Sequence, residues 1–176
     1  MTSQGSGELV DLQQEKAIAS GDQFQMQIVP RQDCYLYVLW IQSQGEPLLL
    51  HPSTGDSAQG KVKARQEVVL PERGLWYKLD NQKGDEVLYV AASYEPIASI
   101  KGLLDQMSTT RGTPDPMVGR ELKSALDDLA GTRGLAGVTS GKPIKVHLPD
   151  GQTTERLTQV LMGKEGVIRK LTVKHL

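Results

Sequence analysis

The stretch CYLYVLWI, residues 34–41, is apolar at nearly every position and rich in aromatic and β-branched side chains. Such side chains favour strands, and successive residues of a strand point to opposite faces. Because both faces of this stretch are apolar, both must be covered by other parts of the protein. The stretch therefore predicts the central strand of a layered β structure, with Trp40 mostly buried.

The segments on either side of this stretch also have strand patterns. Before it, Phe24, Met26 and Ile28 alternate with glutamines, which predicts a strand with one buried face. After it, turn-forming residues lead to three consecutive leucines that begin behind Pro47. The two runs predict an antiparallel hairpin whose second strand lies at a sheet edge.

Three further runs predict strands and are bounded by turn-forming residues: residues 61–70 and 75–79, which alternate in part between apolar and polar side chains, and residues 86–92, which are mostly apolar. About six short strands at this spacing are typical of a sandwich or barrel. The expected fold is mainly β with α, an antiparallel β-sandwich that is immunoglobulin-like in general architecture. Residues 51–60 are rich in Pro, Ser and Gly and predict a surface loop.

A helical excursion is expected at about residues 96–130, where the hydrophobic period changes from two to about 3.6. One apolar stripe with helical spacing is formed by Ile97, Ile100, Leu104 and Met107. A second helix is predicted from Met117 to Ala130, because Asp115 and Pro116 provide an N-cap and a first-turn proline. These helices have apolar faces that must pack on the sheet.

The last 45 residues predict a return to β structure. The glycine-rich residues 131–142 predict no long regular element, and residues 144–148 alternate as a strand. Residues 153–162 are expected to form a short helix, although their threonines would suit a strand. A final strand from Val167 to His175 is expected to return to the sheet. The chain is thus predicted to form one domain over residues 21–176, after a flexible tail over residues 1–20.

Charge and cysteine content exclude several classes of protein. The chain has 20 Lys and Arg against 21 Asp and Glu, a net charge of -1, so we expect no nucleic-acid partner. No apolar run reaches the length of about 18 residues that predicts membrane insertion. The only cysteine, Cys34, excludes an internal disulfide and a multi-cysteine metal site. The chain's start has no signal-peptide pattern, which leaves the compartment open between cytoplasm and cell envelope.

No catalytic, cofactor-binding or metal-binding residue is assigned, because each candidate has a simpler explanation. Cys34 lies in the most apolar strand and is expected to be a buried, inert thiol. His51, His147 and His175 are too scattered for a short metal motif. His147 is expected on a solvated strand face, and His175 lies one residue from the C-terminus.

The remaining candidates also fit structural roles. Residues 53–56 fit a turn, and the adjacent carboxylates Asp127 and Asp128 cannot face each other on a helix. Trp40 and Trp76 are expected in the core, although exposed indoles would suit sugars or bases. A small basic ridge on one strand face, explained by solubility, consists of Lys61, Lys63 and Arg65.

Three short motifs within residues 21–94 carry a family resemblance. An aspartate leads into a tyrosine-rich strand at residues 33–37, a Leu-Leu-x-Pro strand end follows at residues 49–52, and a Gly-Asp-Glu triplet lies at residues 84–86. Together they resemble the bacterial domain of unknown function catalogued as family 4384. The resemblance implies a β-sandwich and transfers no catalytic residue. Family members are similar to modules found alone or beside caspase-like peptidases, kinases and envelope proteins, which implies an accessory or recognition role.

The function expected from the residues and the resemblance is that of a non-catalytic accessory module that binds another protein and needs no cofactor. One alternative is a hydrolase that uses Cys34 or a convergent set of His and Asp residues. The other is a carbohydrate or cell-wall binder that uses an exposed Trp40 or Trp76.

Overall fold

Two long strands form the centre of the molecule, β4 (Cys34–Ile41) and β9 (Gly84–Ser93), which pair antiparallel. The computed structural model describes residues 2–5, 8–11, 17–53, 60–109, 116–132, 137–147, 152–156 and 158–176. β14 (Gly166–His175) pairs with β9, and β5 (Pro47–His51) pairs with β4, so the main sheet has the order β14-β9-β4-β5. β6 (Lys61–Val62) also pairs with β4. The predicted hairpin with an edge strand that starts at Pro47 is confirmed.

A second sheet is built around β3 (Gln23–Ile28), the strand with the Phe24, Met26 and Ile28 alternation. β1 (Thr2–Gly5) and β7 (Val68–Leu70) pair with β3 on its two sides. β2 (Glu8–Asp11) pairs with β1, and the short β8 (Tyr77–Lys78) pairs with β3. The expected strand over residues 61–70 is therefore two short strands, β6 and β7, in different sheets.

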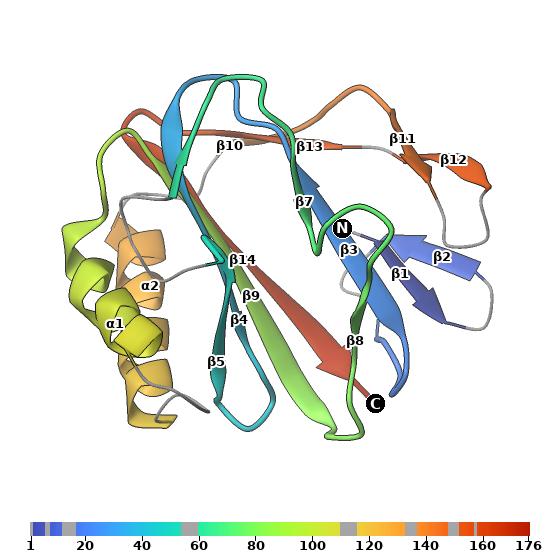
Figure 1. Ribbon diagram of the computed structural model, residues 1–176, viewed down its shortest axis with the longest axis horizontal. Helices are drawn as coiled ribbons and strands as arrows, with labels where there is room; N and C mark the ends of the chain where they lie inside the picture. The colour runs from blue at the N-terminus through green and yellow to red at the C-terminus, as the bar shows by residue number, and fades with distance from the viewer. Residues whose placement is uncertain are drawn as a thin grey trace.

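Two helices, α1 (Ala98–Thr109) and α2 (Pro116–Thr132), cover the face of the main sheet that lies away from the second sheet (Figure 1). The protein thus has three layers, with helices, main sheet and second sheet in that order. This arrangement confirms a mainly antiparallel, α+β, sandwich-like fold with a helical excursion. Neither helix is both long and apolar enough to cross a membrane within the part of the chain that the structure describes.

The strict alternation along β4 explains why this strand is apolar on both faces. One set of its side chains packs between the two sheets: Leu36, Val38 and Trp40. The other set packs against the helices: Tyr37, Leu39 and Ile41. β9 divides in the same way, with Leu88 and Val90 in the inter-sheet core and Val87, Tyr89 and Ala91 in the core under the helices. The predicted burial of Trp40 is confirmed, since the residue is 4% exposed.

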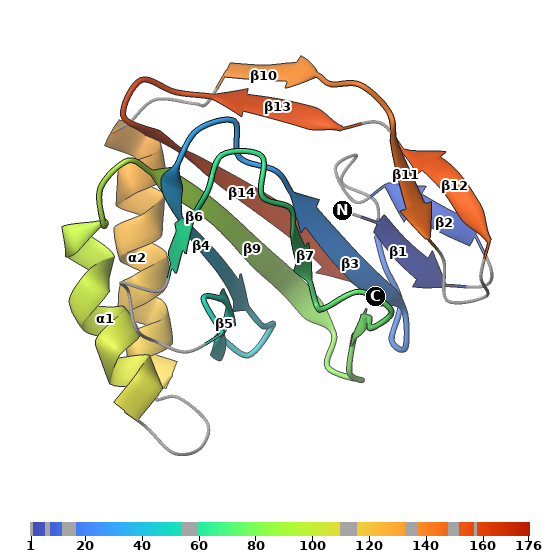
Figure 2. The same cartoon turned by 45° about the horizontal axis from the view of Figure 1, so that its top comes forward.

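Residues 137–147, 152–156 and 158–162 form a bent two-stranded ribbon that passes over the second sheet (Figure 2). Its outer half pairs β11 (Ile144–His147) with β12 (Thr153–Arg156). Its inner half pairs β10 (Gly137–Ser140) with β13 (Gln159–Met162). At the bend, the Gly141 amide donates a hydrogen bond to the Thr158 carbonyl oxygen at 2.7 Å.

The predicted short helix over residues 153–162 is therefore wrong. Cross-strand partners in β10 and β11 satisfy the backbone of this segment, and such pairing overrides the weak helical spacing of its apolar residues. Gly163 does not cap a helix: a Cβ there would lie 2.0 Å from the Gly166 carbonyl oxygen, so the tight turn into β14 needs a glycine. The glycine-rich residues 131–142 include a regular element that was not predicted, β10, which is one strand of the ribbon.

The final strand returns to the main sheet as predicted. β14 pairs with β9 over ten residues, from Gly166 opposite Ser93 to His175 opposite Gly84. On its other side His175 forms a parallel bridge with Ile18, which is 4% exposed although it lies in the segment expected to be a tail. The strands β1 and β2 in that segment were not predicted either. Of the expected loop at 51–60, residues 54–59 lie outside the described residues.

Replacing Trp40 tests the burial of the central strand. Its indole meets Phe24 edge-on, with ring centroids 5.1 Å apart, inside the inter-sheet core. We expect Trp40→Ala to lower the free energy of unfolding by about 3 to 5 kcal/mol, a large part of the roughly 5 to 15 kcal/mol typical of a domain. Trp76→Ala is the matched control, because Trp76 is only half-buried and belongs to neither core, and it should cost less. If Trp40→Ala melted at the same temperature as the parent protein, the place of Trp40 in the inter-sheet core would be contradicted.

Candidate functional site

The thiol of Cys34 lies at the start of β4 and is 7% exposed. Burial, with a smaller contribution from the neighbouring Asp33 carboxylate, raises the pKa of the thiol. A raised pKa disfavours the thiolate, which is the nucleophilic form of cysteine. The expectation of a buried thiol is confirmed, and the position is poorly suited to nucleophilic attack.

The three histidines occupy separate places. His51 ends β5, where burial lowers the pKa of its imidazole. His147 ends β11, and its side chain is not among those described. His175 is buried at the end of β14, which differs from the simple chain-end position expected from the sequence. Within the described ranges, no three His, Cys, Asp or Glu side chains form a group that could hold a metal ion.

A buried polar cluster joins His175 to residues from three other parts of the chain. The Trp40 indole Nε1 donates a hydrogen bond to Glu86 Oε2 at 2.5 Å, and His175 Nδ1 lies 3.7 Å from Glu86 Oε1. The other imidazole nitrogen, Nε2, is 3.0 Å from Ser20 Oγ. Glu86 is 3% exposed, and burial raises the pKa of its carboxyl, which hydrogen bonds from Trp40 and Ser43 oppose only in part.

Ser20, His175 and Glu86 follow the order hydroxyl, imidazole, carboxylate that serine hydrolases use. The geometry fits that role poorly. The separation of His175 Nδ1 and Glu86 Oε1 exceeds hydrogen-bond length, and the imidazole is completely buried. Glu86 already accepts the Trp40 indole hydrogen bond. The contacts instead tie the C-terminal strand to Ser20 and to the edge of the inter-sheet core.

Asp127 is the centre of a second polar cluster, which holds α2 on the main sheet. Its carboxylate accepts hydrogen bonds from the Tyr89 hydroxyl at 2.8 Å, Lys123 at 2.7 Å and Lys170 at 2.8 Å. Burial raises the pKa of Asp127, but the hydrogen bonds from Lys123, Lys170 and Tyr89 outweigh it and bring the pKa to about 2. These partners account for Asp127 without an acid/base role.

A groove of about 220 Å³ lies between the second sheet and the ribbon. Its floor is the outer face of the second sheet, with Gln25 and Gln27 from β3 and Val69 from β7. β11 forms one wall with Lys145 and Val146. A volume of this size is smaller than the roughly 300 to 1,000 Å³ of most small-molecule sites, so it suits one or two side chains of a larger partner.

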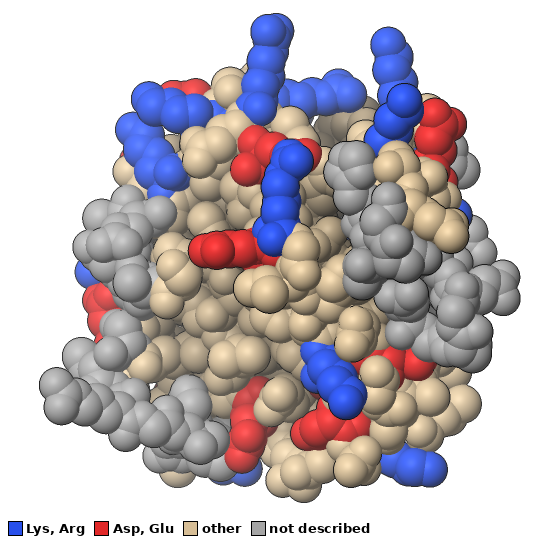
Figure 3. Space-filling view, turned by 45° about the vertical axis from the view of Figure 1, so that its right-hand side comes forward, with Lys and Arg blue, Asp and Glu red and all other residues tan. Residues whose placement is uncertain are grey.

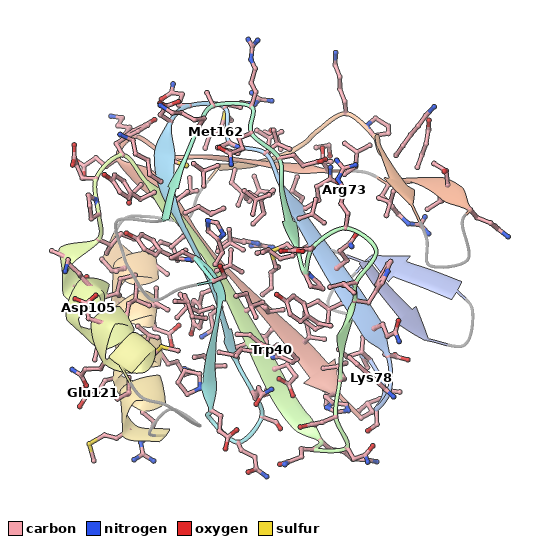
Figure 4. The ribbon with its side chains drawn as sticks, in the orientation of Figure 1. Trp40, Arg73, Lys78, Asp105, Glu121 and Met162 are labelled. Atoms are coloured by element: carbon pink, nitrogen blue, oxygen red, sulfur yellow. The ribbon has the colours of Figure 1, made fainter. Side chains whose placement is uncertain are left out.

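The polar side chains of the groove are mostly fixed by one another. Glu67 accepts hydrogen bonds from both Gln27 and Arg73, and Gln25 Nε2 donates to the Leu75 carbonyl oxygen at 3.1 Å. Figure 4 shows Arg73 on the second sheet next to the ribbon, away from Trp40 in the interior. Lys145 is exposed and has no ion pair with any residue that the structure describes.

Val146 gives the groove an apolar wall. It is 8% exposed but belongs to neither of the two cores. The groove therefore combines side-chain amides, an apolar contact surface and one cation, Lys145, that has no ion pair with a described residue.

The basic ridge expected from the sequence lies at one end of the sandwich, where the β6–β7 turn meets the β3–β4 turn. Arg65 has a φ of 65° and is the only residue other than glycine with a positive φ in the described part of the chain. The left-handed conformation costs an L-residue about 1 to 2 kcal/mol. Its amide donates to the Pro30 carbonyl oxygen at 2.7 Å, which fixes the two turns together.

Comparison with protein families identifies the segment that forms most of both sheets. Residues 17–96 match the family described as Domain of unknown function (DUF4384). The match confirms the resemblance that the three motifs indicated. No curated protein and no solved structure matches the chain.

The DUF4384 segment covers β3 to β9 and ends just before α1. The helices, the ribbon and β14 all lie beyond it, although they cover and complete the main sheet. Both polar clusters and the groove likewise combine residues from inside and outside the segment. The later part of the chain is thus packed directly on the DUF4384 segment.

Sequence reasoning missed Glu86 and His175, although the strand register holds a signal for both. In β9, Glu86 has the same parity as Leu88 and Val90, which face the inter-sheet core. In β14, His175 has the same parity as the buried Val173. A charged or polar side chain in a core-facing position predicts a buried partner.

The pH dependence of stability tests the burial of Glu86. The pKa of Glu86 is raised in the folded protein, so the folded state binds the carboxyl proton more tightly than the unfolded state does. The contribution of Glu86 to stability therefore falls as the pH rises from the pKa of the unfolded state to the pKa of the folded state. Glu86→Gln cannot ionise. We expect its free energy of unfolding to increase relative to the parent between about pH 4 and about pH 7.

Denaturant unfolding at these two pH values measures the effect. Glu72→Gln is the control, because Glu72 is exposed, and it should follow the parent at both. If Glu86→Gln instead lost stability relative to the parent as the pH rose, the folded protein would stabilise the ionised carboxylate, and a raised pKa for Glu86 would be wrong.

Proposed function

We propose that the protein is a non-catalytic accessory module and that it binds a partner protein at the groove between the second sheet and the ribbon. The observation that carries this proposal is the composition of the groove, which is lined by the fixed amides of Gln25 and Gln27, by the apolar Val146 and by Lys145, a cation without an ion pair among the described residues. An extended polypeptide offers backbone groups to the amides and one side chain to the cavity.

The alternatives have less support. A cysteine hydrolase needs an accessible thiolate, and Cys34 is buried with a raised pKa. A carbohydrate binder needs an exposed aromatic platform, and Trp40 lies in the inter-sheet core. Trp76 is half-buried and is the more exposed of the two tryptophans.

Site-specific photo-crosslinking tests the proposed surface. A benzophenone amino acid at Gln27 places the reactive group in the groove, and the same amino acid at the exposed Glu121 of α2 provides a matched control on the opposite layer (Figure 4). In an extract of the source organism, we expect a discrete adduct from position 27 and none from position 121. Lys145→Glu should reduce the yield of that adduct.

Two results would count against the groove. The same adducts from both positions would show non-specific contact, and a yield unaffected by Lys145→Glu would place the partner elsewhere. As a control for folding, each variant should melt at the same temperature as the parent protein.

A further inference from the structure

Arg65 occupies a backbone position that its side chain does not favour. Residues Lys63 to Gln66 form a turn, closed by the hydrogen bond from the Gln66 amide to the Lys63 carbonyl oxygen at 3.1 Å. Arg65 is the third residue of this turn, where a positive φ is normally provided by Gly or Asn. The fold alone would therefore favour one of these residues over arginine.

No contact of the Arg65 side chain with a described residue offsets this cost. The side chain is exposed, and it forms no ion pair or side-chain hydrogen bond with the described residues. A strained position occupied by a charged side chain without an internal contact is typical of a residue with an external role. The bulk of the arginine is thus available to a partner.

Three more cations surround Arg65 at this end of the sandwich. Arg31 comes from the β3–β4 turn, and Lys61 and Lys63 come from β6 and the turn after it; all three are exposed. Together these four cations form the basic patch, which consists of Arg31, Lys61, Lys63 and Arg65. Figure 1 shows both turns at the top of the molecule, and Figure 3 shows Lys and Arg side chains along the top edge, with some Asp and Glu among them.

The patch contains one internal carboxylate, which is already satisfied. Asp33 accepts a hydrogen bond from the Ala64 amide at 2.8 Å and lies 3.4 Å from Lys63 Nζ. These contacts lower the pKa of Asp33, the Ala64 hydrogen bond first. Arg31, Lys61 and Arg65 remain without a described ion pair, in a chain whose net charge is -1. With Asp33 included, the patch holds four cations and one carboxylate.

We infer that the basic patch binds an acidic segment of a partner protein. Charge complementarity selects a partner with spaced carboxylates, and Val29, which is 51% exposed beside the patch, adds an apolar contact. A protein segment fits better than a nucleic acid or an anionic membrane, because the patch is small and the chain as a whole has a net charge of -1. The inference rests on the proposed function only in that the partner is a protein, since the patch and the groove share no residue.

The test measures binding of fluorescent decaglutamate by anisotropy at low and at physiological ionic strength. Arg65→Gly and Lys61→Gln should each weaken binding roughly two- to fivefold, the effect of losing one exposed ion pair, and added salt should weaken binding to the parent. Arg65→Gly should melt at the parent temperature or above, because glycine accepts a positive φ. Lys83→Gln, in the turn before β9, is the control and should change neither binding nor melting, because Lys83 is exposed and has no ion pair with a described residue.

Each contrary result overturns the inference. Absence of decaglutamate binding to the parent, or unchanged binding to Arg65→Gly, removes the patch as a site for acidic segments. Stronger binding to duplex DNA, or to vesicles of phosphatidylserine and phosphatidylcholine in equal parts, assigns the patch to another class of partner. A lower melting temperature for Arg65→Gly would show that the arginine serves the fold. None of these outcomes changes the crosslinks from position 27, so failure here is distinct from failure of the groove.

Discussion

The burial of β4 and β9 on both faces is the constraint on which the rest of the structure depends. Their side chains divide between a core shared with the second sheet and a core shared with the helices. Neither the second sheet nor the helices alone would remove both apolar faces from water, and burial of apolar surface is the main stabilising contribution to folding. Two covering layers are therefore a physical requirement of residues 34–41 and 87–91.

The polar clusters act where these layers meet. Asp127 ties α2 to Tyr89 on β9 and to Lys170 on β14, so the helical layer has polar contacts with the main sheet as well as an apolar one. Glu86 takes the Trp40 indole hydrogen bond at the edge of the other core and lies beside His175. The polar groups that look most like reactive chemistry are thus used within the fold, whereas Lys145 in the groove and Arg31, Lys61 and Arg65 in the basic patch have no ion pair with a residue that the structure describes.

Periodicity in the sequence was enough to predict the layers. The two-sided apolar run at residues 34–41 predicted a covered central strand, and the stripes at residues 97–107 and 117–130 predicted the helices that cover it. Residues 153–162 were assigned wrongly because their local spacing fits a helix, whereas their strand conformation depends on cross-strand partners in β10 and β11. The groove was not predictable, because it arises where the ribbon crosses β3 and β7, a contact between distant segments.

We propose that residues 21–176 fold as one cooperative unit, since the DUF4384 segment relies on α2 and β14 to cover and extend its main sheet. Thermal unfolding of a chain truncated after Met107 tests this claim most directly. That fragment lacks α2, the ribbon and β14, which leaves apolar surface of β4 and β9 open to water. We expect an insoluble or molten fragment that binds a hydrophobic dye and has no cooperative transition. A soluble fragment that melts cooperatively would contradict the account.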